Sequence, residues 1–254
     1  MTDRLFDVRD RVVMVAGGAG GLGEVLARAF AERGARIALA DIDGTRARKI
    51  ARTLGAADGN GLGCVLDVRK QPSCAGAVRR VVKRFGRLDV LINAVGIFST
   101  AAAVELDRRA WDATIATNLS GAFLIAQAAG RIMVKEKSGR IITIASASSR
   151  VANPGYAAYA AAKAGVSQLT RVLALEWAPF GVTVNAIGPA MTPTPLTREL
   201  LADGERHAAA LARIPLGRFG TPEDLIGVAL LLASDAGAFI TGQTIFVDGG
   251  RTLV

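Results

Sequence analysis

Short apolar segments alternate with longer helical patterns along almost the whole chain, and this alternation restricts the fold more than any other feature. Several of the segments are almost continuously apolar, as strands buried on both faces of a sheet are. The predicted strands are 11–16, 36–40, 63–67, 88–93, 140–146, 182–187 and 244–247. The predicted helices include 21–33, 71–85, 117–136, 157–178 and 222–233. This order predicts an α/β fold with a doubly wound, mostly parallel sheet covered by helices on both faces.

Length and composition favour a single domain over residues 1–254. Hydrophobic residues make up 51% of the chain, and no low-complexity linker interrupts it. The apolar run at 225–233 is far shorter than the roughly 18 residues of a membrane span. The N-terminal segment contains acidic residues and has no apolar core, so we expect no secretory signal and a cytoplasmic protein. Cys64 and Cys74 match no metal or redox spacing, and we expect free buried thiols and no metal.

The formal net charge of +9 raises the question of nucleic-acid binding. The basic residues are dispersed, with local groups at 46–52 and 79–84 on predicted helices and no aromatic residues interleaved. Such groups are typical of solvated helix faces. We therefore expect no nucleic-acid partner, and at most a weak, salt-sensitive attraction to anions.

A glycine-rich turn joins the first predicted strand to the first helix. Gly17, Gly21 and Gly23 form a G-x-x-x-G-x-G pattern there. Glycines at these positions allow a tight turn and a close approach of the backbone, so that the helix N-terminus can receive a pyrophosphate. At the first strand of a parallel sheet, this pattern predicts a nucleotide-binding turn.

Asp41 follows the second predicted strand. A carboxylate there accepts hydrogen bonds from the adenosine ribose hydroxyls and repels a 2′-phosphate. Asp43 is the better placed cap for the next helix, which leaves Asp41 for the ribose. Because the glycine turn holds no Arg or Lys, the sequence favours NAD over NADP. Arg46 and Arg48 are the residues that would reverse this preference.

The segment "YAAYAAAK" (156–163) offers two tyrosines and one lysine. Tyr159 and Lys163 are four residues apart and therefore share one face of a helix, whereas Tyr156 is two turns from Lys163. A free tyrosine titrates near pH ~10 and is a poor base, but a nearby cation lowers its pKa. Alone, the pair is weak evidence, because a Tyr and a Lys four residues apart more often reflect ordinary packing beside a solvated amine.

Together these motifs resemble those of the short-chain dehydrogenase/reductase family, and the resemblance covers almost the whole chain. The matching segments are "AGGAGGLG" (16–23), "NAVG" (93–96), "IASAS" (144–148), "YAAAK" (159–163) and "GPAMTPT" (188–194). The chain departs from the family pattern at Ala16, Ala94 and Ala190. The resemblance implies a Rossmann-type domain with seven strands and a nicotinamide cofactor.

The resemblance also implies a catalytic set. Tyr159 would act as general acid/base, and Lys163 would lower the phenol pKa and hold the cofactor ribose. Ser146, thirteen residues before Tyr159, would bind the substrate oxygen. Asn118 would anchor a water that relays protons, unless it merely distorts a helix. Tyr156 would line the pocket.

Further residues are implied as contacts of the cofactor. They are Gly17, Gly21, Leu22, Gly23, Asp41, Asp67, Val68, Asn93, Tyr159, Lys163, Pro189 and Thr194. For Asp67, capping of the following turn is an equally good interpretation.

Residues 190–215 are expected to form a loop and a short helix that close over the substrate. Arg198, Glu199, Arg206, His207 and Arg213 would either bind an acidic or hydroxylated substrate or face water, and we favour water for most of them. His207, the single histidine, is expected at the surface or in the lid.

The sequence thus predicts an NAD-dependent oxidoreductase acting on a small-molecule secondary alcohol or ketone. An NADPH-dependent 3-oxoacyl thioester reductase and a silent nucleotide-sensing protein are the alternatives, and the complete catalytic set favours an enzyme. The helices at 117–136 and 157–178 carry small and apolar residues on more than one face. Since the family pairs its subunits there, we expect a homotetramer; alanines on an exposed surface are the alternative.

Overall fold

Seven strands form one parallel sheet in the order β3-β2-β1-β4-β5-β6-β7. The protein is described by a computed structural model that covers residues 4–55 and 61–254. The strands are β1 (Val12–Ala16), β2 (Arg36–Asp41), β3 (Gly61–Val65), β4 (Val90–Asn93), β5 (Gly139–Ile144), β6 (Val182–Pro189) and β7 (Thr244–Val247). The predicted α/β class and parallel sheet are confirmed.

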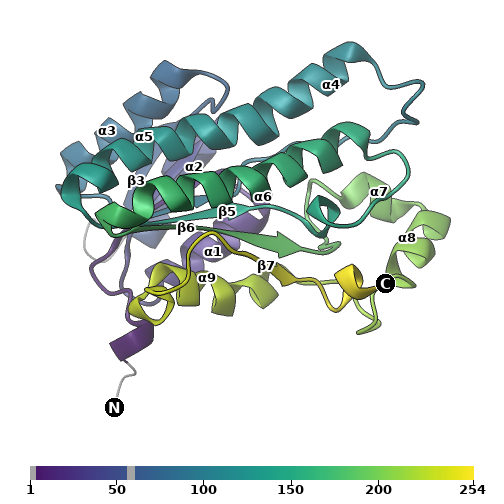
Figure 1. Ribbon diagram of the computed structural model, residues 1–254. Helices are drawn as coiled ribbons and strands as arrows, with labels where there is room; N and C mark the ends of the chain where they lie inside the picture. Colours follow the sequence, from purple (N-terminus) through teal and green to yellow (C-terminus); the bar gives the residue numbers. More distant parts are fainter. Residues whose placement is uncertain (1–3, 56–60) are drawn as a thin grey trace.

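Helices cover both faces of the sheet (Figure 1). One face carries α1 (Gly21–Ala31), α2 (Gly44–Leu54) and α9 (Ile226–Ala233). The other carries α3 (Gln71–Phe85), α5 (Gly121–Glu136) and α6 (Ala157–Trp177). The remaining α-helices are α4 (Arg108–Ile115), α7 (Arg198–Ala202) and α8 (Gly204–Leu211). Short 3-10 helices span Arg4–Phe6, Ala147–Ser149, Ala178–Phe180, Pro222–Leu225, Asp235–Gly237 and Arg251–Leu253.

The core consists of two apolar layers, one on each face of the sheet. Strand β1 shows why its sequence is continuously apolar, because all five of its residues are buried. Val13 and Val15 point into the layer beneath α1 and α9, whereas Val12 and Met14 point into the layer beneath α3 and α5. Full burial of such a side chain stabilises the fold by about 1.5–3 kcal/mol.

Strand β3 begins two residues earlier than predicted and ends at Val65, not at residue 67. The sequence "GLGCV" has a loop-like composition, but its glycines are required by the close passage of α2. A Cβ on Gly61 would lie 1.9 Å from the Ala51 carbonyl oxygen, and one on Gly63 would lie 2.3 Å from the Arg48 Cα. The strand therefore uses glycine for packing.

Two helical features differ from the sequence-based expectation. The predicted helix at 117–136 begins with a π-helical turn, Ala116–Ser120, that leads into α5. Helix α4 was not predicted; it is short, and Thr114 is its only fully buried residue. Both features lie at the edge of the site described below.

The strand order changes direction between β1 and β4, whose carboxyl ends bound a crevice. In open α/β sheets, ligands bind at such a switch point. Within the part of the chain that the structure describes, no helix is long and apolar enough to cross a membrane.

Candidate active site

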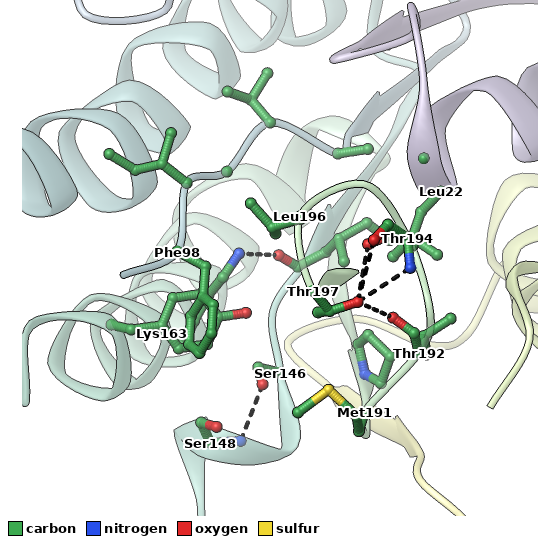
Figure 2. A pocket seen from close by; sticks show the side chains of 18 of the residues that line it. Leu22, Phe98, Ser146, Ser148, Lys163, Met191, Thr192, Thr194, Leu196 and Thr197 are labelled. Atoms are coloured by element: carbon green, nitrogen blue, oxygen red, sulfur yellow. Dashed lines mark hydrogen bonds between the residues drawn. The ribbon is translucent and has the colours of Figure 1, made fainter. Parts of the chain in front are cut away.

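A cavity of about 900 Å³ lies at the carboxyl ends of the strands. It extends from the glycine turn and the ends of β2 and β3, past α6, to the segment that contains α8. Figure 2 shows its centre, with Phe98 and Lys163 on one side and Met191, Thr192 and Thr194 on the other.

The glycine turn has the geometry of a dinucleotide cradle. Gly17 has a φ of 76°, and a Cβ there would lie 2.8 Å from the Val95 backbone nitrogen. A Cβ on Gly23 would lie 2.1 Å from the Gly17 carbonyl oxygen, so the helix could not pack against the turn. Helix α1 begins after Gly20 without a side-chain cap. Its first N–H groups suit a pyrophosphate, and the residues present therefore fit a dinucleotide.

Asp41 lies at the end of β2 and lines the cavity. Its carboxylate accepts hydrogen bonds from the backbone N–H groups of Ala19 and Asp43, both at 3.0 Å. These bonds fix the carboxylate beside the glycine turn, and each oxygen keeps a further acceptor position. Asp43 caps α2 by accepting from the N–H of Arg46 at 2.9 Å, as predicted.

Arg46 borders the same part of the cavity. One of its guanidinium nitrogens lies 3.3 Å from Glu24 Oε2 and 3.6 Å from the position of a Cβ on Gly20. The basic group that the glycine turn lacks in sequence is thus supplied from α2. Arg48 donates to Thr45 Oγ1 and does not line the cavity.

Asp67 and Val68 line the cavity beyond the end of β3. The Asp67 carboxylate accepts from the backbone N–H and the guanidinium of Arg69, which hold its pKa below the usual range. Asp67 therefore caps the turn, the alternative given by sequence, while it also lies in the cavity wall.

Asn93 is buried and does not line the cavity. Its Oδ1 accepts from the Val95 N–H at 3.2 Å and so shapes the loop that follows β4. Ala94, where the family has a second Asn, does line the cavity, and its N–H donates to the Ala16 carbonyl at 2.8 Å.

Ser146, Tyr159 and Lys163 meet at the centre of the cavity, as predicted. The Ser146 hydroxyl accepts from the Ser148 N–H at 3.1 Å, and it lies close enough to Tyr159 to lower the pKa of the phenol. Lys163 is only 4% exposed, and its Nζ donates to the Ile144 carbonyl at 2.7 Å (Figure 2). Nζ lies 5.7 Å from the centre of the Tyr159 ring.

Burial dominates the proton affinities of this pair. It raises the pKa of Tyr159 to about 12, and the nearby Ser146 hydroxyl only partly offsets this effect. Burial lowers the pKa of Lys163 to about 8. Burial is thus the main cause of the raised pKa of Tyr159, and the lowering of the phenol pKa by Lys163 stays a prediction.

Asn118 lies in the π-helical turn and is 2% exposed. Its Oδ1 accepts from the Ile97 N–H and its Nδ2 donates to the Ile97 carbonyl, both at 2.9 Å. A Cβ on Gly96 would lie 3.5 Å from Asn118 Oδ1 and 3.7 Å from Lys163 Nζ. The turn thus distorts the helix and also brings Asn118 close to Lys163.

Phe98 is a cavity residue that the sequence reasoning missed. Its ring contacts those of Tyr156 and Tyr159 edge to face, each with centroids 4.9 Å apart. Tyr156 lines the cavity, as predicted. The position of Phe98 directly after the "NAVG" loop was the available signal.

Leu22, Pro189 and Thr194 line the cavity as expected. The Thr194 N–H donates to Thr197 Oγ1, which itself donates to the Thr192 carbonyl (Figure 2). These bonds fold the start of the segment 190–215 back over the glycine turn.

The charged residues of this segment divide into two groups. Arg206 and Arg213 line the cavity, whereas Arg198 and His207 do not. The His207 ring packs against Phe219 with centroids 4.9 Å apart, which agrees with a lid position. The side chain of Glu199 lies outside the described residues.

Within the described residues, no group of His, Cys, Asp or Glu side chains suits a metal ion. Cys64 and Cys74 are free and buried, as predicted. Burial raises the pKa of Cys74 to about 11, so this thiol stays protonated at neutral pH.

A dinucleotide cradle that leads to a Ser, Tyr and Lys group defines a nicotinamide-dependent oxidoreductase acting on a CH–OH group. A family model described as "Enoyl-(Acyl carrier protein) reductase" matches residues 17–252. The chain belongs to the short-chain dehydrogenase/reductase family.

Curated relatives and solved structures match the chain over nearly its full length. D-threitol dehydrogenase of Mycolicibacterium smegmatis is 41% identical over 250 residues, 98% of this chain and 96% of the relative. NAD-dependent glycerol dehydrogenase of Listeria innocua is 36% identical, with 99% and 97% covered. A gluconate 5-dehydrogenase from Burkholderia cenocepacia, solved with NADP and tartrate, superposes with a TM-score of 0.93 at 35% identity, with 99% and 98% covered.

Proposed function

We propose that this oxidoreductase interconverts a small secondary alcohol and its ketone, with Tyr159 as general acid/base and NAD as the preferred cofactor. The observation that carries this proposal is the grouping of Ser146, Tyr159 and Lys163 at the centre of a cavity that has the glycine cradle at one end, with Asn118 buried behind the cavity wall near Lys163. Bound NAD supplies the acceptor for a hydride from the carbinol carbon.

In oxidation, Tyr159 first releases its own proton toward Lys163 and Asn118, and the phenolate then takes the proton of the alcohol while the Ser146 hydroxyl holds the substrate oxygen. In reduction, the same phenol donates its proton to the oxygen. With a pKa of about 12, Tyr159 carries this proton at neutral pH and is ready to donate it. Lys163 and Asn118, close to one another across Gly96, provide an exit for protons toward the cavity wall.

The preference for NAD rests on Asp41. Its carboxylate is fixed beside the glycine turn by two backbone hydrogen bonds, so a 2′-phosphate there meets a negative charge. The guanidinium group of Arg46 would instead attract a 2′-phosphate, although the carboxylate of Glu24 partly neutralises its charge. Relatives described with NAD and with NADP both occur, so the balance of these two charges decides the preference in this chain.

A turnover screen with NAD(H) and NADP(H) tests the proposal. Polyols, hydroxy acids and a 3-oxoacyl thioester are offered in the matching direction, and the reduced-nicotinamide absorbance is followed. We expect turnover of an alcohol or ketone with NAD as the better cofactor. Turnover of the thioester alone with NADPH would support the reductase alternative. Tight cofactor binding without any turnover would support a sensor.

A further inference from the structure

The charged residues that line the cavity differ between its two ends. Among the described residues that line it, the acidic ones are Asp41, Asp43 and Asp67, which follow β2 and β3 at the nucleotide end. The charged residues of the opposite end, beyond Tyr156, are Arg206, Arg213 and Arg251. The part of the cavity left for the substrate is therefore lined by positive charge alone within the described residues.

Two of these arginines share one neutral acceptor. Asn153 Oδ1 accepts from Arg213 Nη1 and from Arg251 Nη2, each at 3.1 Å. The two donor nitrogens are therefore separated by no more than twice that distance. Arg251 also donates to the Val254 backbone oxygen, and Arg206 lies 3.6 Å from Asp203. In the described part of the chain, neither Arg213 nor Arg251 forms an ion pair with an Asp or Glu side chain.

An anion would stabilise this arrangement. Two guanidinium groups on one amide oxygen repel each other, and the amide carries no charge to compensate them. A carboxylate or phosphate group that bridges them accepts paired hydrogen bonds and removes the repulsion. Ordinary surface arginines point separately into water. These two come from segments far apart in the sequence, after α8 and at Arg251–Leu253, and converge on the same side chain.

The two arginines lie on the side of Tyr156 that faces away from the nucleotide end of the cavity. Asn153 precedes Tyr156 by three residues, and the Tyr156 ring lies edge-on to Tyr159 with centroids 6.2 Å apart. Burial raises the pKa of Tyr156, and the positive charges of Arg213, Arg206 and Arg251 oppose this rise because they lie nearby. An anion at Arg213 and Arg251 would thus lie in the same cavity as Tyr159, on the side of Tyr156.

We propose that the substrate is an anionic secondary alcohol or ketone, whose carboxylate or phosphate group binds Arg213 and Arg251 while its carbinol carbon lies at Tyr159. This inference rests on the proposed function and names its substrate class. Arg213 and Arg251 are binding residues that select the substrate and take no part in proton transfer.

The test compares substrates that share a six-carbon chain: gluconate with a carboxylate, glucitol 6-phosphate with a phosphate, and neutral glucitol. We expect one of the two anionic compounds to have at least roughly tenfold higher kcat/KM than glucitol, because a hydrogen bond to a charged group contributes about 1.5–3 kcal/mol. The KM of that compound should also rise with ionic strength. The anionic compound with the higher kcat/KM shows whether the site prefers a carboxylate or a phosphate.

Two variants and a matched control assign the effect to the site. Arg213→Met and Arg251→Met should each raise the KM for the anionic substrate roughly tenfold with little change in kcat, and should leave glucitol unaffected. Arg198→Met, in the same lid but outside the cavity, should change neither. Because Arg213 is exposed, its replacement is not expected to unfold the protein.

A binding measurement separates this inference from the proposed function. Tyr159→Phe protein loaded with cofactor is titrated calorimetrically with the same three compounds, so no turnover is needed. Tighter binding of an anionic compound, lost in Arg213→Met, supports the site even if no alcohol is turned over. Equal binding of glucitol and both anions by the protein, or equal losses for neutral and anionic compounds in the variants, would overturn the proposal.

Discussion

At the scale of single residues, the two tyrosines near the start of α6 differ in what surrounds them. Tyr159 lies beside Ser146 and Lys163, whereas Tyr156 lies toward the arginine end of the cavity, and the Phe98 ring contacts both tyrosines. Tyr159→Phe removes the transferable proton and retains the ring. Turnover should fall by at least about 100-fold while cofactor binding persists, because general acid–base catalysis contributes roughly 10²–10⁴-fold.

Tyr156→Phe is the matched control, since it removes the same hydroxyl one turn away. We expect only a mild effect on kcat. Single-turnover kinetics with both variants makes the comparison. Similar losses in the two would contradict the assignment of Tyr159 as the acid/base.

The buried Lys163 should also be visible in stability. Its pKa is about 8 in the folded protein, against 10.5 for an ordinary lysine. Between these values the unfolded chain binds more protons, so the free energy of unfolding rises with pH, by up to about 1.4 kcal/mol per pH unit. The raised pKa of Tyr159 has the opposite effect above pH 10, where the folded protein retains the proton.

Urea unfolding at a series of pH values checks this expectation. Lys163→Met should abolish the rise between pH 8 and 10 and should be more stable than the parent protein at pH 7. If the free energy of unfolding varied with pH in the same way in both proteins, Lys163 would not be desolvated, and the structure would be contradicted on this point.

Cofactor choice depends on Asp41 and Arg46. Asp41→Ala should weaken NADH binding roughly tenfold or more and relax discrimination against NADPH, because it removes both a charged acceptor and a repulsive charge. Asp41→Asn, which keeps the side-chain shape, should relax discrimination with a smaller loss of NADH affinity. Arg46→Gln should weaken NADPH selectively. Fluorescence titration measures all three, and a parent protein that already prefers NADPH would refute this view of Asp41.

The grouping of the candidate site residues could be predicted from the sequence, but its electrostatics could not. Spacing places Tyr159 and Lys163 on one helix face, and the order of motifs adds Ser146 and Asn118. Burial, which sets the two pKa values, depends on the loop after β4 and on the Ile144 carbonyl. The pairing of Arg213 with Arg251 on Asn153 joins three segments that are distant in sequence, and no local pattern encodes it.

At the scale of elements, the π-helical turn before α5 is the feature that links structure to the site. It turns the Asn118 amide toward both backbone groups of Ile97. Asn118→Ala should lower the free energy of unfolding by about 1–2 kcal/mol, since two polar groups at the cavity wall lose their partner. Activity should fall as well, because the loop next to Lys163 loses its anchor.

Thr114→Val provides the matched control for this turn. Thr114 is buried in α4 and donates only to the Ala110 carbonyl within its own helix. We expect a comparable or smaller loss of stability with normal kcat. Chemical denaturation and initial rates on the two variants separate a role in the site from a role in folding.

The elements that were predicted best are those with strong apolar periodicity or continuous apolar runs. Strand β1 and helix α3 illustrate this, because neither depends on a neighbour for its pattern. The start of β3 was missed, since its glycines are there to admit α2 and not to make a turn. Helix α4 was missed because it buries almost nothing. Such features become visible only once the elements pack.

At the scale of the whole molecule, one side of α6 is a stripe of exposed residues, most of them apolar but including Gln168 and Arg171. The exposed positions Ala161, Ala164, Val172 and Leu175 follow one side of the helix, and Leu175 is 81% exposed. Helices α5 and α6 lie side by side on this face (Figure 1). Small residues near one end of the stripe allow a second helix to approach closely, as a two-fold interface between identical chains requires.

We therefore expect a homotetramer in which α5 and α6 form one of the interfaces, and Leu175→Glu should reduce the mass of the particle measured by light scattering at micromolar concentration. A buried carboxylate at a two-fold axis meets its own copy, and the repulsion adds to the loss of apolar contact. Val104→Glu is the matched control, because Val104 is 95% exposed in the loop before α4 and lies outside both helices. It should leave the mass unchanged. A parent protein with the mass of a monomer and full activity would rule out the tetramer, and equal effects of the two variants would remove α6 from the interface.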